Sequence, residues 1–270
     1  GTSLYITKDL ALARRKFEDF KIDKSIYVVG AEQNFHFKQL FKALEMMGFK
    51  QAKDCEHLSY AHVKLPEGKI SSRKGNAIPF SLLQKTLLKE FEPYLDKYQD
   101  TWTTEELKET AKKLALGSIR YGMLQADPQK QITFDVKTWT NFEGHTGPYL
   151  MYSYSRTRSI LRKKGEASAQ QKKEEPSYEK LIHPREKELL LQIYDFNEIV
   201  KQACLTHKPS SLSQYLYKLC KSFNRFYAEI SVLHTEDAAL KEARFKLVEA
   251  LSKTLKEGLL LLGITPPEKM

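Results

Sequence analysis

Apolar residues at the start of the chain alternate between short runs and helical spacing. Residues 1–9, 25–30 and 58–65 are expected to be strands, and residues 10–20 and 35–47 carry apolar side chains at the spacing of a helix. Short apolar runs of this kind are typical of buried parallel strands. The order strand, helix, strand, helix, strand therefore predicts a parallel α/β sheet, in which ligands bind beyond the carboxyl ends of the strands.

Helical patterns dominate the rest of the chain. We expect helices at residues 81–91, 104–124, 147–164, 184–205, 211–233 and 236–262. Broad apolar stripes on the later ones predict an all-α bundle in the C-terminal half. Residues 165–177 are rich in Lys, Glu, Gln and Ala and are expected to form a solvent-exposed linker.

A change of pattern near Asp127 and Pro128 predicts a domain boundary. Residues 1–127 would form an α/β domain with its connecting helices, and residues 128–270 would form a helical domain. The predicted fold class is therefore α/β followed by all-α.

The chain of 270 residues carries a net charge of +10 with a pI near 9.2, and 14 Tyr and 14 Phe residues offer stacking surfaces beside that charge. This balance favours a polyanionic partner, of which nucleic acid is the first candidate. The cysteines Cys55, Cys204 and Cys220 lack C-x-x-C spacing, so neither a zinc site nor a disulfide framework is expected. Since no apolar run reaches about 18 residues, we expect a cytoplasmic protein without a membrane span.

The first candidate site is the basic stretch at residues 69–76, which places Lys69, Arg73 and Lys74 beside the hydroxyl of Ser71. A strand before this stretch and a helix after it would set backbone amides, hydroxyls and ammonium groups around one concavity. That arrangement suits a polyphosphate or the negative charge that develops on it during reaction. The alternative is a solvated basic hairpin, because basic runs often lie on the surface.

Polar side chains also follow the predicted strands. Tyr5 and Asp9 lie at a corner between strand and helix, and Gln33 follows the strand that ends at Gly30. A carboxylate, a phenol hydroxyl and an amide at neighbouring strand ends would enclose a cation, and guanidinium is the planar cation that carboxylates bind best. The alternatives are a helix N-cap for Asp9 and ordinary packing for the other two. His36, which opens the next helix, either contacts a purine or is structural.

The block at residues 139–158 alternates aromatic residues with cations around a Gly-rich turn. Unpaired RNA bases are commonly held by stacking on Tyr or Trp, while arginines hold phosphates. Tyr149, Tyr152 and Arg156 are therefore candidates for RNA binding. The alternative is that they form one face of a helix that packs on the bundle.

Taken together, these segments resemble the arginyl-tRNA synthetase family of class I aminoacyl-tRNA synthetases. Residues 1–9 resemble the family's G-T-x-L-Y-x-T-R-D segment, and residues 139–158 resemble its F-E-G-x-T-G-P-Y-L-x-Y-x-x-S-R segment. Residues 27–37 are similar to its next strand and turn, residues 69–75 to the class I KMSKS loop, and residues 258–264 to the end of its anticodon-binding domain. Because the loop is shared by many class I enzymes, the first two segments carry the assignment to arginine.

The resemblance implies roles for the residues at the predicted strand ends. Tyr5, Asp9 and Gln33 match positions that hold the arginine substrate, with Asp9 facing the guanidinium group. Gly30 and His36 match the ATP side. The polar cluster is therefore expected to be the amino-acid and nucleotide site.

The resemblance assigns the basic stretch to the leaving pyrophosphate. Lys69, Ser71, Arg73 and Lys74 are the expected catalytic group, and Lys69, Ser71 and Lys74 are also expected ATP ligands. Ser72 stands where the second lysine of KMSKS would be, so Arg73 or Lys74 is expected to supply that charge.

The C-terminal half is implied to bind tRNA. Tyr149, Tyr152 and the terminal Met270 match positions that shape and pack the anticodon loop. The implied architecture is the second half of a class I Rossmann-like catalytic domain, followed by a helical-bundle anticodon-binding domain of the DALR type.

The family's HIGH motif is absent from this sequence. We therefore expect the chain to be the C-terminal portion of the enzyme and to be inactive by itself. The complete enzyme would activate arginine with Mg2+ and ATP and transfer it to tRNA(Arg), as a monomer with no zinc or other resident metal or cofactor. The alternatives are another class I synthetase and, for the isolated chain, a non-catalytic tRNA-binding module.

Overall fold

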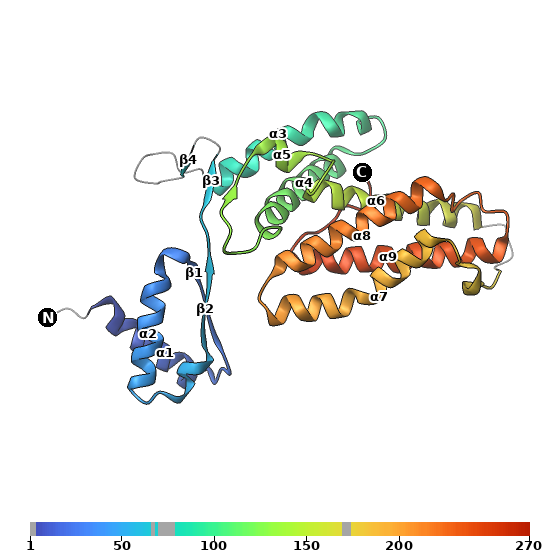
Figure 1. Cartoon of the computed structure of the whole chain (residues 1–270). Coiled ribbons are helices and arrows are strands. Elements are labelled where there is room, and N and C mark those ends of the chain that lie inside the picture. The colour runs from blue at the N-terminus through green and yellow to red at the C-terminus, as the bar shows by residue number, and fades with distance from the viewer. Residues whose placement is uncertain (1–3, 66–67, 70–78, 169–173) are drawn as a thin grey trace. The chain divides into compact units, whose positions relative to one another are not determined.

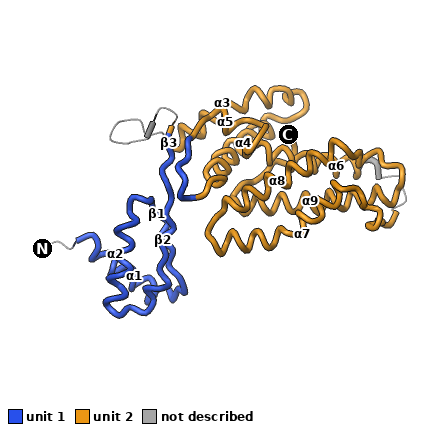
Figure 2. Tube along the Cα trace, in the orientation of Figure 1, with its two compact units in different colours: residues 1–64, 128–133 blue, residues 65–127, 134–270 orange. Residues whose placement is uncertain are grey.

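The computed structural model of the chain describes residues 4–65, 68–69, 79–168 and 174–270 (Figure 1). The chain divides into two compact units, which are coloured separately in Figure 2. The first contains residues 1–64 and 128–133, and the second contains residues 65–127 and 134–270. Compact units need not coincide with evolutionary domains, so the boundary after residue 127 stays a prediction.

The first unit is built on two parallel strands, β1 (Ser25–Gly30) and β2 (Cys55–Tyr60), which pair in register from Ser25 with Cys55 to Gly30 with Tyr60. Two helices, α1 (Tyr5–Phe20) and α2 (Asn34–Met46), supply most of the core that packs with this sheet. That core consists of Ala13, Phe37, Leu40, Leu44 and Ala52. The parallel pairing predicted from the short apolar runs is confirmed for these two strands.

The predicted strand at residues 1–9 is wrong over the part that the structure describes. Residues 5–9 form the first turns of α1, and Leu4 is its N-cap with an extended backbone. The cause is visible in the packing, because Ile6 and Leu10 contact the same core as Ala13. The helical spacing of apolar residues therefore begins at Ile6, several residues before the predicted start.

Two other features of the first unit differ in detail from the sequence pattern. The predicted strand at 58–65 is divided into β2 and β3 (Val63–Leu65), and β3 pairs in parallel with β5 (Ile132–Thr133). The 3-10 helix η1 (Ala31–Gln33) joins β1 to α2, and η2 (Lys50–Asp54) leads into β2. Gly48, two residues after the end of α2, has a φ of 74°, which glycine adopts without strain.

The described part of the second unit is mainly helical, and its strand residues are the end of β3 at Leu65 and the short strand β4 (Gly68–Lys69). Its helices are α3 (Phe80–Leu95), η4 (Asp96–Tyr98), α4 (Thr104–Leu124), α5 (Val136–Thr140), α6 (Gly147–Ser168), η5 (Tyr178–Lys180), α7 (Pro184–Leu205), α8 (Pro209–Glu229) and α9 (Ala238–Leu261). The all-α bundle predicted for the C-terminal half is confirmed. Its fully buried side chains include Leu114, Leu150, Leu216, Phe223, Leu251 and Leu255.

The predicted linker at 165–177 is wrong at its start, because α6 continues to Ser168. Lys, Glu and Ala are good helix formers, so the polar composition that suggested a linker also permits the helix to extend. Residues 169–173 of this predicted linker lie outside the described residues. Among the described helices, none has a stretch both long and apolar enough to cross a membrane.

Candidate functional site

A polar cluster lies on the first unit where α1 and α2 begin. Asp9 is the fifth residue of α1 and His36 is the third residue of α2. The His36 Nε2 atom lies 2.8 Å from Asp9 Oδ2, and each side chain is 22% exposed. The Tyr5 ring tilts against the imidazole with 5.4 Å between ring centroids. The structure therefore brings together Tyr5 and Asp9, predicted for arginine, with His36, predicted for ATP.

Asp9 is not a helix N-cap, because it lies a full turn inside α1. Its carboxylate accepts one hydrogen bond at Oδ2 when the imidazole carries the proton on Nε2. An ionised carboxylate has about four lone-pair positions, so Asp9 can accept further hydrogen bonds from a cationic ligand. A partly exposed carboxylate beside an aromatic ring suits a guanidinium group, which both donates and stacks.

Gly30 and Gln33 lie on the connection between β1 and α2. Gly30 is buried, and a Cβ atom at this position would collide with the carboxylate of Glu32. Gln33 is the half-buried last residue of η1. Glu32, whose Oε2 lies 3.4 Å from His62 Nε2, was not among the predicted site residues. Glu32 lies between Gly30 and Gln33, which were both predicted for the site, and this position was the sequence signal that could have identified it.

Most of the predicted pyrophosphate-binding residues lie outside the part of the chain that the structure describes. Ser71, Arg73 and Lys74 lie outside the described residues. The backbone of Lys69 forms part of β4, but its side chain is not described. The roles of these four residues stay predictions.

A second cluster lies between α6 and α8 in the helical unit. The Arg156 guanidinium donates to Asn224 Oδ1 and to the Tyr152 hydroxyl, both at 2.9 Å. Its central carbon lies 4.7 Å from the centroid of the Tyr152 ring and 5.0 Å from that of Tyr227. Asn224 in turn donates from Nδ2 to the Tyr149 hydroxyl at 2.9 Å. We call these five residues the α6–α8 cluster.

The α6–α8 cluster contains all three predicted RNA-binding residues of α6. Asn224 and Tyr227, which α8 supplies, were missed in the sequence. Their spacing of three residues on an amphipathic helix gave a weak signal, since many such pairs simply face solvent. Burial raises the pKa of the Tyr149 hydroxyl above its usual value. Tyr149 is therefore a neutral hydrogen-bonding group at physiological pH.

Basic and aromatic side chains border this cluster. Tyr217 lies 5.6 Å from Tyr149 between ring centroids, and 4.4 Å from His145. Burial lowers the pKa of His145, so this imidazole favours the neutral form. Lys218, Lys221 and Arg225 are exposed on α8. Cations beside partly exposed rings suit the phosphates and bases of RNA.

The predicted residue Met270 ends the C-terminal tail, which contacts α6 through side chains outside this cluster. Ser155 donates to the Pro267 carbonyl at 2.7 Å, and Arg158 donates to Glu268 Oε2 at 2.6 Å. At about 100° per residue, Arg158 projects about 120° around α6 from Tyr152, whereas Ser155 lies within about 60° of it. The described contacts therefore hold the C-terminal tail against α6, with Met270 half-buried at its end.

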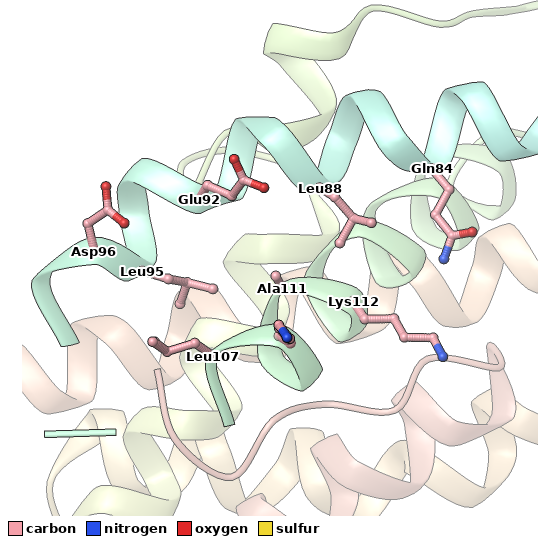
Figure 3. Close-up of a pocket in the computed structure, with 9 residues that line it drawn as sticks. Gln84, Leu88, Glu92, Leu95, Asp96, Leu107, Ala111 and Lys112 are labelled. Carbon is pink, nitrogen blue, oxygen red and sulfur yellow. The ribbon is translucent and has the colours of Figure 1, made fainter. Parts of the chain in front are cut away.

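A separate cavity of about 340 Å3 lies between α3 and α4 (Figure 3). It is lined by Gln84, Leu88, Glu92, Leu95, Asp96, Leu107, Lys108, Ala111 and Lys112. Its apolar side chains are flanked by carboxylates on α3 and η4 and by ammonium groups on α4, and it contains no predicted site residue. Within the described residues, no group of three or more His, Cys, Asp or Glu side chains is placed to hold a metal ion.

Two family models match the chain. Residues 1–136 match the catalytic domain of class I tRNA synthetases of the arginine type, described as "tRNA synthetases class I (R), catalytic domain". Residues 150–270 match the DALR anticodon binding domain. Together they confirm the predicted fold class, a partial class I catalytic domain followed by a helical anticodon-binding domain.

Similar proteins carry the same assignment. The chain is 44% identical over 271 residues to an arginine–tRNA ligase of Bdellovibrio bacteriovorus, covering 100% of this chain and 46% of that protein. A Clostridium acetobutylicum arginine–tRNA ligase is 40% identical, with 100% of this chain and 47% of that protein covered. The solved structure of Thermus thermophilus arginyl-tRNA synthetase matches with a TM-score of 0.88 and 29% identity, over 100% of this chain and 50% of that one.

The chain thus spans about half the length of the curated relatives that it matches. Both matching models and the full-length coverage of this chain agree with the motifs at residues 1–9 and 139–158. The chain belongs to the arginyl-tRNA synthetase family of class I aminoacyl-tRNA synthetases, and it corresponds to the C-terminal portion of these enzymes.

Proposed function

We propose that this chain supplies the arginine pocket and the anticodon-binding surface of an arginine–tRNA ligase. The observation that carries this proposal is the contact of Asp9 with His36, with the Tyr5 ring beside them. It sets a partly exposed carboxylate close to an aromatic ring, which fits the guanidinium group of arginine. An acidic side chain would disfavour an apolar or thiol side chain there, so another class I specificity fits less well.

The proposed reaction has two steps. An oxygen of the arginine carboxylate attacks the α-phosphorus of ATP in line. A bond forms between this oxygen and the phosphorus, and the bond from the phosphorus to the departing pyrophosphate breaks. The terminal ribose hydroxyl of tRNA(Arg) then attacks the acyl carbon of the adenylate, loses its proton, and displaces AMP. Neither step requires a covalent bond to the protein, so catalysis would depend on positioning and on stabilisation of charge.

The proposal assigns a separate role to each group of residues in this chain. Asp9 and Tyr5 bind the guanidinium group, with Gln33 contributing its amide, while Gly30 and His36 border the nucleotide. From the sequence alone, Lys69, Ser71, Arg73 and Lys74 stabilise the negative charge on the departing pyrophosphate. Each well-placed donor of this kind contributes about 3 to 4 kcal/mol to transition-state stabilisation. Mg2+ would enter with ATP as part of the substrate.

The helical unit is proposed to bind the anticodon region of tRNA(Arg). Tyr149, Tyr152 and Arg156 form one hydrogen-bonded surface with two residues of α8, bordered by exposed cations. For this chain on its own, we propose tRNA binding without arginine activation. The contacts of the α6–α8 cluster favour this second function because they lie wholly within the helical unit. A monomeric state and a cytoplasmic location stay predictions.

Exchange of pyrophosphate into ATP tests the arginine pocket in the intact synthetase that contains this chain. Asp9→Asn should raise the KM for arginine about 10- to 100-fold, because a hydrogen bond to a charged group contributes about 1.5 to 3 kcal/mol. It should also narrow the preference for arginine over citrulline, whose side chain ends in a neutral urea. Asp19→Asn is the matched control, since Asp19 lies on the same helix and pairs with Arg15 at the surface. An unchanged KM for arginine in Asp9→Asn would contradict the proposal.

A further inference from the structure

A ladder of stacked rings lies where α3 passes through η4 toward α4. The Tyr98 and Trp102 rings are nearly parallel, at an interplanar angle of 11° and 4.5 Å between centroids. The Tyr94 ring stacks on Phe142 at 4.0 Å and 20°. Lys97 Nζ lies 4.0 Å from the Tyr94 centroid and 4.9 Å from that of Tyr98. We call these five residues the α3 ladder.

The α3 ladder is not part of the buried core. Its four rings are all half-buried, and Lys97 is exposed. The core side chains of α3 are instead Leu87, Phe91 and Leu95. Within the described residues, Lys97 forms no ion pair with a carboxylate. Its ammonium group is therefore held over aromatic rings at the surface, where a phosphate can compete for it.

The α3 ladder includes the chain segment that leads into α6, because Tyr94 stacks on Phe142, five residues before Gly147. Burial raises the pKa of the Tyr94 hydroxyl, and the neighbouring hydroxyls of Tyr98 and Tyr152 raise it further. Tyr152 is the residue that accepts a hydrogen bond from Arg156. Both groups lie in the helical unit.

We infer that the α3 ladder is a second stacking subsite for the RNA that the α6–α8 cluster binds. An unpaired base would stack on the partly exposed Tyr98 and Trp102 pair, while Lys97 would exchange its ring contacts for the adjoining phosphate. Stacking platforms with a nearby cation hold single-stranded nucleotides without reading their sequence. This inference rests on the proposed binding of tRNA by the helical unit.

The acidic residues next to Lys97 bear on the choice of ligand. Asp96 accepts a hydrogen bond from Gln99 at 2.6 Å and lines the cavity between α3 and α4 (Figure 3). Asp100 is exposed on the turn that follows η4. A phosphate near Lys97 would be repelled by Asp100, so Asp100→Asn should strengthen RNA binding. A basic protein partner would show the opposite response.

Tryptophan fluorescence of this chain offers a direct test. The chain has two tryptophans, and Trp139 is only 4% exposed with its ring edge-on to Phe134. A stacked base quenches indole emission, so titration with a tRNA(Arg) transcript should quench Trp102. Trp102→Phe should abolish most of the quenching while it preserves a ring for stacking. Trp102→Leu should weaken tRNA binding about 5- to 20-fold, because the stacking of one base is lost.

Salt dependence separates a phosphate contact from a structural role. Lys97→Ala should weaken tRNA binding and lower the slope of log affinity against log salt by about 0.7, the value for one phosphate on a single strand. Lys89→Ala is the matched control, since Lys89 is also exposed on α3. Thermal melts of each variant would confirm that the fold is retained.

The outcomes distinguish this inference from the function on which it rests. Binding of tRNA with no quenching of Trp102, together with an unchanged salt slope in Lys97→Ala, would overturn the α3 ladder as a subsite. Tight binding would then still support the α6–α8 cluster. No binding of the transcript by the unmodified chain would overturn both proposals. If Asp100→Asn weakened the binding that is measured by quenching, this result would also count against an RNA ligand.

Discussion

The Asp9 carboxylate and the His36 imidazole lie 2.8 Å apart although 27 residues separate them in the sequence. The contact joins the early turns of α1 and α2, where both side chains are 22% exposed. His36 therefore can orient the carboxylate that is proposed to face the guanidinium group. The family resemblance alone had placed His36 on the ATP side.

Replacement of His36 tests this orienting role in the intact synthetase. His36→Leu removes the donor to Asp9, and the KM for arginine should rise about 10-fold, because a hydrogen bond to a charged group contributes about 1.5 kcal/mol. His36→Gln retains a donor and should restore most of the affinity. Pyrophosphate exchange at varied arginine and varied ATP measures both effects. A rise confined to the KM for ATP in both variants would show instead that the imidazole contacts the nucleotide.

Arg156 is predicted to position its neighbours, since its guanidinium already donates to Asn224 and Tyr152 and lies over the rings of Tyr152 and Tyr227. Arg156→Lys keeps the charge but loses the planar group. We therefore expect Arg156→Lys and Arg156→Ala to weaken tRNA binding by a similar factor of about 10, as for the loss of one stacked base. Filter binding at several salt concentrations measures this.

The exposed Arg225 of α8 is the comparison for Arg156. Arg225→Lys should bind tRNA almost as well as the unmodified chain, whereas Arg225→Ala should lower the salt slope by about 0.7. Full retention of affinity in Arg156→Lys would contradict the positioning role. It would indicate that Arg156 acts as a simple charge on a phosphate.

Helix boundaries were predictable where capping residues mark them. The helix at 104–124 has the predicted bounds, because Thr103 and Glu106 form a capping box. The helix at 184–205 also has them, because Pro184 occupies its first turn. The start of α1 has no such signal, since Leu4 makes no side-chain cap. The sequence therefore left residues 5–9 open to assignment as a strand.

The candidate sites were predictable only within each local segment. Tyr152 and Arg156 are four residues apart on α6, so one helical period brings them together. Their contact with Tyr227 depends instead on the packing of α6 against α8, which no local pattern specifies. The pairing of Asp9 with His36 likewise requires α1 and α2 to pack on each other. Contacts between distant segments are set by the tertiary fold.

The ion pair between Glu186 and Arg244 should be important for stability of the helical unit. Arg244 Nε donates to Glu186 Oε1 at 2.7 Å, and the exposed fractions of the two side chains are 1% for Glu186 and 16% for Arg244. Arg244→Met would leave a buried carboxylate without its cation, at a cost of about 3 to 5 kcal/mol in the free energy of unfolding. Urea denaturation followed by circular dichroism measures this.

Two comparisons sharpen that prediction. Glu186→Leu combined with Arg244→Met should be less destabilised than Arg244→Met alone, because no charge is then buried without a partner. Glu249→Gln removes the surface pairs with Lys246 and Lys253 and should change the free energy of unfolding by less than about 1 kcal/mol. If Glu249→Gln and Arg244→Met lowered the free energy of unfolding equally, burial of the unpaired carboxylate would carry no extra cost.

Glu268 is predicted to hold the C-terminal tail in a pH-dependent way. Its carboxylate accepts hydrogen bonds from Tyr154 and Arg158, both at 2.6 Å. Burial raises the pKa of Glu268, but these two donors and the charges of Arg158 and Lys256 outweigh it, so the pKa falls below its ordinary 4.5. A lowered pKa in the folded state means that the attachment is fully present above about pH 4.5 and is lost as the pH falls through the lower value.

The methyl resonance of Met270 reports on this attachment, because Met270 follows Glu268 by two residues and the chain has only five methionines to assign. Acidification below pH 4.5 should shift and narrow this resonance as the tail detaches. Glu268→Gln should produce the same change already at pH 7, since a neutral amide cannot replace the carboxylate opposite Arg158. Glu236→Gln, at an exposed position before α9, should leave the resonance unchanged. A Met270 signal in Glu268→Gln that matches the unmodified chain at pH 7 would show that other contacts hold the tail, such as the hydrogen bond from Ser155 to the Pro267 carbonyl.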